Sequence, residues 1–213
     1  MATTMWLYAF LKAIAWPLFK MYHRLEVHGT ENMKTFPYIV VGNHVSNLDP
    51  IYIATFYPKP LHFMAKRELF KSRGMRFLLT QLGAFPVNRS GHDLGAVKHA
   101  LRLLKQKASI GLFPEGTRTK RFLEGDFKQG AAFFAIKSGV PVLPAAIFGT
   151  DCAMPKGKRM VRPAKVRILY GQALYPKEGE TAEMFGERIK EALLVLINEG
   201  EKRGWVCQTS HSE

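Results

Sequence analysis

The chain has 213 residues, enough for one sizeable domain, and its 47% hydrophobic and 23% charged residues are typical of a globular protein, which excludes extended disorder. Two cysteines are too few for a disulfide framework, and this low count favours a reducing, cytosolic environment. The net charge of +14 indicates an anionic partner, which could be nucleic acid, an anionic membrane or a phosphorylated substrate; a basic protein without a special partner is the alternative.

The N-terminal stretch, residues 5–19, is apolar and rich in aromatic side chains. A helix that crosses a membrane needs about 20 consecutive apolar residues, and this stretch is shorter and interrupted by Lys12 and Pro17. It also lacks the basic leader of a secretory signal peptide. We therefore predict a membrane-interface helix over residues 1–23, with a helix that packs in the core as the alternative. The side chains that suit the lipid headgroup region are Trp6, Tyr8, Lys12, Trp16, Lys20 and Tyr22.

Short apolar runs alternate with amphipathic stretches along residues 24–213, which indicates a single α/β domain. Strands are predicted at residues 38–41, 85–87, 110–113, 142–148 and 166–170. Helices are predicted at residues 50–56, 75–82, 93–105, 127–138 and 181–199. The apolar side chains expected to face the core are Leu94, Val97, Leu101 and Leu104 in the 93–105 helix, and Phe185, Ile189, Leu193 and Leu196 in the last helix.

Polar clusters follow two of the predicted strands. Asn43 and His44 come directly after the strand at residues 38–41. The second cluster follows the strand at residues 110–113 and consists of Glu115, Gly116, Thr117 and Arg118. Ligands of α/β domains bind beyond the carboxyl ends of strands, so the two clusters are candidate parts of one site.

In the first cluster, His44 ends a strand and Asp49 begins the next helix. The short turn between them allows the carboxylate to fold back onto the imidazole, where it would fix the ring tautomer and stabilise an imidazolium. The other ring nitrogen could then act as a general base toward an alcohol, because no nucleophile of the protein itself is evident. The alternative is a helix-capping Asp49 and a His44 that is only a satisfied polar residue; Asp49 could also do both jobs.

The second cluster suits an anionic ligand. Gly116 lets the backbone approach a ligand closely, and Arg118 offers a planar fork that matches phosphate. The Thr117 hydroxyl can donate to phosphate oxygens, and Lys66 and Arg89 are further phosphate-binding candidates. The alternatives are a plain turn with a surface arginine, a solvated lysine and a salt-bridged arginine.

Further basic residues gather in two groups that could contact an anionic leaflet or could simply be solvated loops. The first group is Lys59, Lys66, Arg67, Lys71, Arg73 and Arg76, and the second is Lys156, Lys158, Arg159, Arg162, Lys165 and Arg167.

Four sequence elements occur in a fixed order: Asn43-His44-x-Ser46-x-x-Asp49; Lys66-x-x-Leu69 through Gly83-x-Phe85-Pro86-Val87-x-Arg89; Phe113-Pro114-Glu115-Gly116-Thr117-Arg118; and Val140-Pro141-Val142-x-Pro144. With them, residues 35–175 resemble the 1-acylglycerol-3-phosphate acyltransferase family, within the wider glycerolipid acyltransferases. Two departures are small: Asn88 stands where the family commonly has Asp, and Thr119 where it commonly has Ser.

The resemblance implies a mixed, largely parallel central sheet flanked by helices and an acyltransferase domain over residues 24–213. It implies acyl transfer from acyl-CoA or acyl-carrier protein to the sn-2 hydroxyl of lysophosphatidic acid, in phospholipid biosynthesis, with no cofactor and no metal. His44 matches the family's base and Asp49 its partner. The positions that match those associated with the acceptor's phosphate are Lys66, Arg89, Glu115, Gly116, Thr117 and Arg118.

We therefore expect an enzyme that attaches to the cytoplasmic face of the cell membrane, peripherally or monotopically, and does not bind nucleic acid. One alternative is acylation of glycerol-3-phosphate or another lysophospholipid. A nucleic-acid-binding protein is less well supported, because the sequence has no recognised motif for it. A non-catalytic lipid-binding scaffold is disfavoured by the intact pair of His44 and Asp49.

Overall fold

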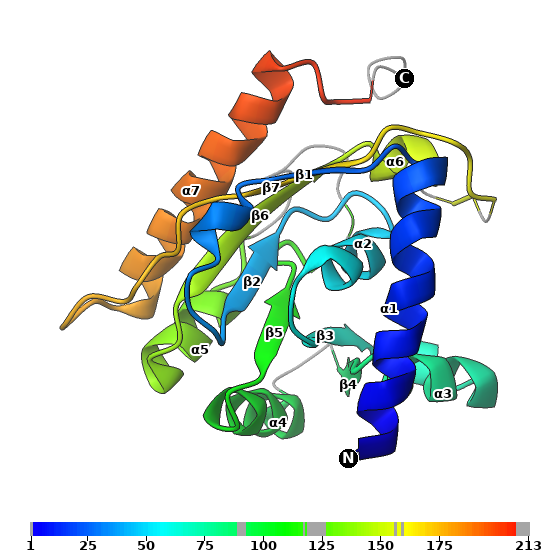
Figure 1. Cartoon of the computed structure of the whole chain (residues 1–213). Helices are drawn as coiled ribbons and strands as arrows, with labels where there is room; N and C mark the ends of the chain where they lie inside the picture. The colour runs from blue at the N-terminus through cyan, green and yellow to red at the C-terminus, as the bar shows by residue number, and fades with distance from the viewer. Residues whose placement is uncertain are drawn as a thin grey trace.

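The computed structural model describes residues 2–88, 93–116, 118, 127–155, 157–158 and 160–207. At its centre lies a seven-stranded sheet with the order β1-β7-β6-β2-β5-β3-β4 (Figure 1). Neighbouring strands run parallel except β6 and β7, which pair antiparallel, so the predicted mixed, largely parallel sheet is confirmed. The strands are β1 (Glu26–His28), β2 (Ile39–Gly42), β3 (Leu61–Lys66), β4 (Phe85–Val87), β5 (Ser109–Leu112), β6 (Val142–Phe148) and β7 (Arg167–Tyr170).

Helices cover both faces of the sheet. Ile39 and Val41 of β2 point into a core formed with α4 (Leu94–Lys105), α5 (Gly130–Ser138) and α7 (Ala182–Lys202). The intervening Val40 points into a second core formed largely with α2 (Asp49–Phe56), next to α1 (Ala2–Tyr22). This alternation follows from the strand period of two. The shorter helices are α3 (Arg73–Gln81) and α6 (Thr150–Ala153), with single 3₁₀ turns η1 (Thr30–Asn32) and η2 (Arg67–Phe70).

The buried face of α7 is the predicted one, since Phe185, Ile189, Leu193 and Leu196 are all buried. For α4 the prediction is partly wrong. Its buried residues are Ala96, Ala100 and Leu104, while Leu94 is 68% exposed. The small alanine side chains let this helix lie close to the sheet and turn Leu94 outward.

Every predicted helix and strand is present, with ends that differ by a few residues. The sequence did not predict the strands β1 and β3 or the helix α6. In β3 the apolar run is interrupted by His62, and β1 has only three residues, of which the first is charged. Such strands lack the apolar pattern on which sequence reasoning depends.

The inner side of α1 packs on the domain. The hydroxyl of Tyr8 donates to the carbonyl of Ala54 at 3.3 Å and accepts from the backbone N–H of Leu61 at 3.3 Å. The ammonium of Lys12 donates to the carbonyl of Tyr57, and burial lowers the pKa of this lysine. The expectation that Tyr8 and Lys12 lie at lipid headgroups is therefore wrong.

The outer side of α1 carries exposed apolar side chains, among them Trp6 (69% exposed) and Met21 (80% exposed). In the described part of the chain, no helix combines the length and apolar character that crossing a bilayer requires.

A disulfide joins Cys152 in α6 to Cys207 near the C-terminus. This bond fastens the segment after α7 to the short helix that follows β6. The cysteine count did not predict the pair, and the pairing removes the basis on which that count favoured a reducing environment.

Candidate active site

His44 and Asp49 lie in direct contact. His44 follows β2, and Asp49 is the first residue of α2, so the turn between strand and helix brings their side chains together. The imidazole Nδ1 lies 2.8 Å from the carboxylate Oδ2. The side chain of His44 is 12% exposed and that of Asp49 is 0% exposed. A carboxylate at Nδ1 holds the proton there and leaves Nε2 as the nitrogen that can accept one.

The carboxylate of Asp49 is held by three further donors. Its Oδ2 also accepts the backbone N–H groups of Val45 and Ser46, each at 2.8 Å. Its Oδ1 accepts the hydroxyl of Thr150 at 2.5 Å. These partners belong to the turn and to α6, and no side-chain hydrogen bond caps the first turn of α2. Of the two predicted roles, the structure shows the contact with His44 and not the helix cap.

An aromatic ring supports the imidazole. The ring of Phe113 stacks on that of His44 with centroids 4.3 Å apart and planes 19° apart. Phe63 stacks in turn on Phe113, with centroids 5.5 Å apart. Phe113 belongs to the third sequence element, but its contact with His44 depends on the pairing of strands distant in sequence, so local spacing could not reveal it.

Asn43 fastens the end of β2 to the neighbouring strand. Its side-chain amide donates to the carbonyl of Ile147 at 3.0 Å and accepts the N–H of the same residue at 2.8 Å. The Asn43 amide thereby takes the place of the backbone N–H and C=O that would otherwise pair with Ile147 beyond the end of β2. This fixes the backbone directly before His44 and explains why an amide side chain suits position 43.

The second polar cluster reaches the same edge of the sheet. Val41 pairs with Leu112 and Phe63 with Gly111, so the continued registers bring His44 level with Glu115 and Lys66 level with Pro114. The carboxylate of Glu115, which is 5% exposed, accepts the backbone N–H of His44 at 3.4 Å. Glu115 therefore supports the turn that carries His44.

Of the other predicted phosphate-binding residues, the structure describes three and leaves two outside the described ranges. Gly116 has a left-handed φ of 65°, and a Cβ there would lie 3.1 Å from the Lys128 side chain, so glycine suits this turn. Lys66 is exposed and Arg118 is half-buried. Among the described residues, neither of these two makes a hydrogen bond or ion pair with the dyad. Arg89 and Thr117 lie outside the described residues.

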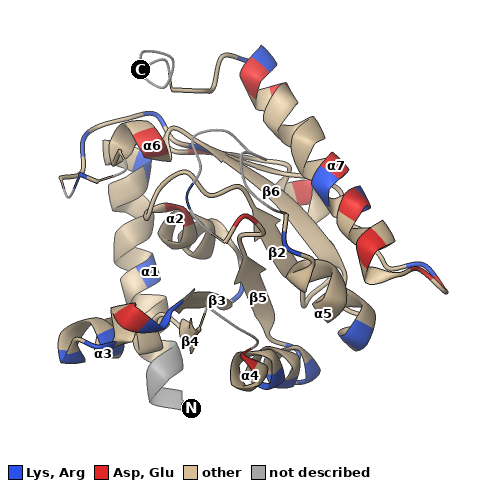
Figure 2. Cartoon of the chain, turned by 180° about the vertical axis from the view of Figure 1, so that it is seen from behind, with Lys and Arg blue, Asp and Glu red and all other residues tan. Residues whose placement is uncertain are grey.

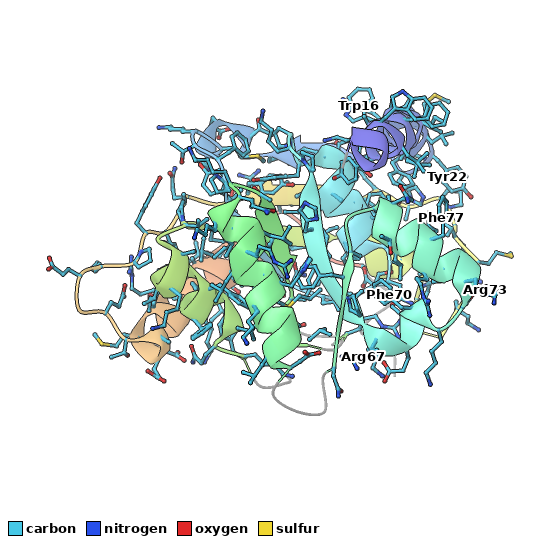
Figure 3. All side chains as sticks on the ribbon, turned by 90° about the horizontal axis from the view of Figure 1, so that it is seen from below. Trp16, Tyr22, Arg67, Phe70, Arg73 and Phe77 are labelled. Atoms are coloured by element: carbon cyan, nitrogen blue, oxygen red, sulfur yellow. A yellow bond between two sulfur atoms is a disulfide. The ribbon has the colours of Figure 1, made fainter. Side chains whose placement is uncertain are left out.

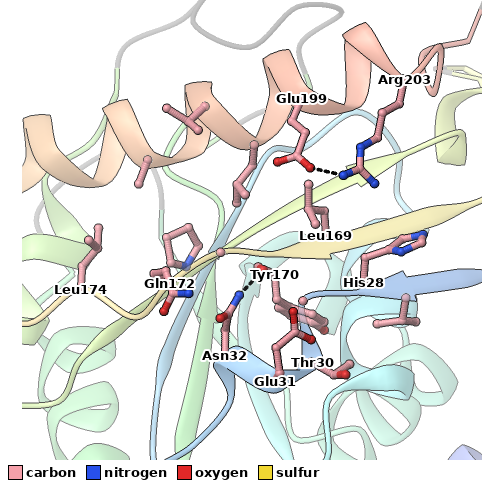
Figure 4. A pocket seen from close by; sticks show the side chains of 17 residues that line it. His28, Thr30, Glu31, Asn32, Leu169, Tyr170, Gln172, Leu174, Glu199 and Arg203 are labelled. Atoms are coloured by element: carbon pink, nitrogen blue, oxygen red, sulfur yellow. Dashed lines mark hydrogen bonds and ion pairs between the residues drawn. The ribbon is translucent and has the colours of Figure 1, made fainter.

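One hollow in the described part of the chain is lined by none of the predicted site residues. This hollow, of about 710 Å³, lies between α7 and the edge formed by β1 and β7, where Glu199 and Arg203 pair above Leu169 (Figure 4).

One grouping of possible metal ligands occurs in the described ranges, formed by Asp151, Cys152 and Cys207. Its two sulfurs are bonded to each other and are not available as thiolates.

Comparison with known proteins places this geometry in a family. The sequence profile of the family described as Acyltransferase matches residues 24–148. The chain is 30% identical over 189 residues to a 1-acyl-sn-glycerol-3-phosphate acyltransferase of Pseudomonas aeruginosa, covering 87% of this chain and 68% of that protein. It is 29% identical to the Bacillus subtilis protein of the same name, covering 78% of this chain and 87% of the relative.

Other relatives are longer. The chain spans about half the length of the chloroplastic 1-acyl-sn-glycerol-3-phosphate acyltransferases of Brassica napus and Arabidopsis thaliana, with 52% and 46% covered at 29% and 30% identity. Among solved structures, the 1-acyl-sn-glycerophosphate (LPA) acyltransferase PlsC from Thermotoga maritima superposes with a TM-score of 0.80 at 28% identity, covering 94% of this chain and 82% of that one. The resemblance predicted from the four sequence elements is thereby confirmed, and the chain belongs to the acyltransferase family.

Proposed function

We propose that this protein transfers a fatty acyl group from a thioester to the sn-2 hydroxyl of lysophosphatidic acid and so forms phosphatidic acid. The observation that carries the proposal is the 2.8 Å contact between His44 Nδ1 and Asp49 Oδ2 at the carboxyl end of β2. It is supported by relatives named as 1-acyl-sn-glycerol-3-phosphate acyltransferases in bacteria and plants.

In the proposed reaction, His44 Nε2 removes the proton of the acceptor hydroxyl as its oxygen attacks the thioester carbonyl. The imidazolium formed is stabilised by Asp49, whose carboxylate already faces Nδ1. When the tetrahedral intermediate collapses, the carbon–sulfur bond breaks and His44 returns the proton to the departing thiolate. A general base placed in this way contributes about 10²–10⁴-fold to the rate. The reaction balances without a metal or cofactor.

The acceptor's phosphate is proposed to bind the cations beside the dyad. Lys66 ends β3 next to the strand that leads to Phe113, and Arg118 comes three residues after Glu115 in the chain. Arg89 and Thr117 are predicted to join them. Glu115 is better suited to supporting the turn, because it is buried against the backbone N–H of His44 and a carboxylate repels phosphate.

The proposed donor is acyl-CoA or acyl-carrier protein. The cationic surface suits either, because both carry phosphate at the end of the pantetheine arm opposite the thioester. Figure 2 shows Lys and Arg gathered on α3 and α4, whereas α7 carries acidic and basic residues in turn.

The proposed membrane contact is the outer face of α1 together with α3. Trp6, Phe10 and Ile14 follow one another on the exposed side of α1, and Phe77 and Leu78 are exposed on α3, which packs against α1. Figure 3 shows Trp16 and Tyr22 of α1 and Phe77 of α3 along the outer edge of the molecule. Basic residues accompany this apolar face, and each contributes about 1 kcal/mol near an anionic leaflet. They are Lys59, Lys71, Arg73 and Arg76, whereas Arg67 pairs with Asp93 and lies away from Trp16 and Tyr22 (Figure 3).

Vesicle sedimentation tests the membrane contact without removing α1, whose inner side packs on the domain. We expect Phe10→Ser and Phe77→Ser each to weaken binding to anionic vesicles about tenfold, because one phenylalanine leaves the bilayer surface. Val195→Ser, which removes a 59% exposed apolar side chain from α7, is the matched control and should bind as the wild type does. Equal losses in all three variants would contradict the proposed face.

Thiol release tests the reaction. Purified protein is incubated with oleoyl-CoA, with and without lysophosphatidic acid, and compared with His44→Ala. Release that depends on the acceptor and is lost in the variant supports the proposal. Release without acceptor would indicate a thioesterase, and release with glycerol-3-phosphate or another lysophospholipid alone would reassign the acceptor.

A further inference from the structure

Thr150 contacts the side of Asp49 that faces away from His44. Its hydroxyl donates to Oδ1 at 2.5 Å, across 101 residues of sequence, and the threonine is 0% exposed. None of the four sequence elements that identify the family contains this residue. Among the described residues, it is the one side chain or backbone group recorded as a donor to Oδ1.

The backbone before Thr150 has a conformation that only glycine adopts readily. Gly149 has a φ of 80°, and a Cβ there would lie 2.1 Å from the carbonyl oxygen of Lys165. This turn ends β6 and begins α6, so that the first side chain of α6 points at the start of α2. The position of the hydroxyl is therefore fixed by the backbone.

Two further contacts join this region to the turn that carries His44. The hydroxyl of Ser46 donates to the carbonyl of Met154 at 3.0 Å, at the end of α6. The amide of Asn43 pairs with both backbone groups of Ile147 in β6. Both ends of the segment from Ile147 to Met154 are thus linked to the segment from Asn43 to Asp49, and Thr150 makes a third link between them.

The carboxylate of Asp49 keeps its orientation toward His44 Nδ1 only if both of its oxygens accept hydrogen bonds. Oδ2 accepts His44 Nδ1 and two backbone N–H groups, and these donors fix one oxygen. Rotation of the carboxylate about its Cβ–Cγ bond would carry Oδ2 away from Nδ1. A donor at Oδ1 opposes that rotation, because hydrogen bonds at both oxygens define the carboxylate plane.

We propose that Thr150 is a positioning residue for the acyl transfer, which acts through Asp49 on His44. This inference rests on the proposed function, in which His44 is the base. Thr150 touches neither substrate; its hydroxyl keeps the carboxylate plane aligned with Nδ1–H as the imidazole gains and loses its proton. Loss of the hydroxyl therefore slows turnover and leaves substrate binding unchanged.

The chain offers a matched control in Thr55. This residue is 5% exposed and lies in α2, and its hydroxyl donates to the carbonyl of Ile51 at 2.8 Å. Thr55→Val removes a buried threonine hydroxyl from the same helix that begins with Asp49, without touching the carboxylate. Thr150→Val has the same change in shape and polarity but removes the donor to Oδ1. Thr150→Ser keeps that donor.

The experiment compares wild type, Thr150→Val, Thr150→Ser and Thr55→Val by steady-state kinetics with oleoyl-CoA and lysophosphatidic acid. We expect kcat of Thr150→Val to fall about 10–100-fold, by analogy with the loss seen when the hydrogen-bond partner of a metal-ligating side chain is removed. Both KM values should stay within about twofold, Thr150→Ser should recover most of the rate, and Thr55→Val should match the wild type. A normal kcat in Thr150→Val, a loss confined to KM, or an equal loss in Thr55→Val would overturn the proposal.

A readout without turnover separates this inference from the proposed function. The proton shared between His44 Nδ1 and Asp49 is observed by NMR and assigned by its absence in His44→Ala. We expect it to exchange faster with water in Thr150→Val than in wild type and Thr55→Val. If the wild type forms no product, the proposed function fails, while an unchanged proton signal in Thr150→Val would still refute the positioning role.

Discussion

The turn from His44 to Asp49 and the cations proposed to bind phosphate, Lys66 and Arg118, are held differently. The carboxylate of Asp49 is fully buried and meets four donors, and the ring of His44 lies against Phe113. Among the described residues, Lys66 and Arg118 make no ion pair or side-chain hydrogen bond. The proposed reacting groups are thus held by the protein, whereas no described residue pairs with the two proposed phosphate-binding cations. Fixed groups serve the transition state, and available donors serve binding.

The largest loss of activity should come from substitutions of Asp49 or His44. We expect Asp49→Asn to lower kcat about 10²–10⁴-fold with little change in KM, because an amide can present its NH₂ to Nδ1 and favour the wrong imidazole tautomer. His44→Ala should lose at least as much. Initial-rate measurements over a range of both substrates check this. If either variant kept its kcat while KM rose, the residue would serve substrate binding and not the proposed proton transfer.

Removal of the disulfide tests whether the contacts that hold His44 and Asp49 depend on the segment after α7. The loop between Cys152 and Cys207 spans 55 residues, so the chain-entropy estimate gives up to about 4 kcal/mol of stabilisation. Cys207→Ser should therefore lower Tm by at most about 8–16 °C for a protein of this size. At 25 °C the rate should be unchanged, because the contact between Thr150 and Asp49 does not involve either sulfur.

Calorimetry of wild type and Cys207→Ser, each with and without reductant, measures this effect. Reductant should lower Tm of the wild type and leave that of the variant as it is. A wild type whose Tm does not respond to reductant would show that the bond adds nothing to stability.

Arg118→Ala tests the proposed binding of the acceptor's phosphate. Loss of one charged hydrogen-bond donor costs about 1.5–3 kcal/mol, so KM for lysophosphatidic acid should rise about 10–100-fold while kcat changes little. Lys105→Ala is the control, because it removes the same charge at the end of α4, directly before β5 begins and therefore at the opposite edge of the sheet. Equal effects in the two variants would mean that net charge alone attracts the acceptor.

The smallest effect concerns Phe113. Phe113→Leu keeps an apolar side chain but loses the stacked ring, which is worth about 0.5–1.5 kcal/mol. We expect kcat to fall about two- to tenfold with both KM values unchanged. An altered KM instead would place Phe113 against the substrate and not only behind His44.

Sequence patterns predicted the elements with strong local signals. The apolar stripe of α7 is one example, because its buried side chains from Phe185 to Leu196 recur every three to four residues. The approach of His44 to Asp49 was also predictable, because the four residues between them form a short turn from strand to helix that leaves few arrangements. Local patterns suffice where the partners are close in sequence.

The remaining features depend on contacts between distant segments. Thr150 reaches Asp49 across 101 residues, and Phe113 reaches His44 through strand pairing, so neither contact leaves a local signature. The inward direction of Tyr8 and Lys12 was missed for the same reason, since their partners Ala54 and Tyr57 lie in and after α2. The amino acid types correctly indicated that the N-terminal segment is apolar, but not which side of α1 packs against the domain.

Product analysis is the most direct measurement of the central claim. Wild type and His44→Ala are incubated with labelled oleoyl-CoA and lysophosphatidic acid, and the extracted lipids are separated. The account predicts labelled phosphatidic acid from the wild type and a yield lower by at least about 10²-fold from the variant. Equal yields from both proteins, or no labelled phosphatidic acid from the wild type, would contradict it.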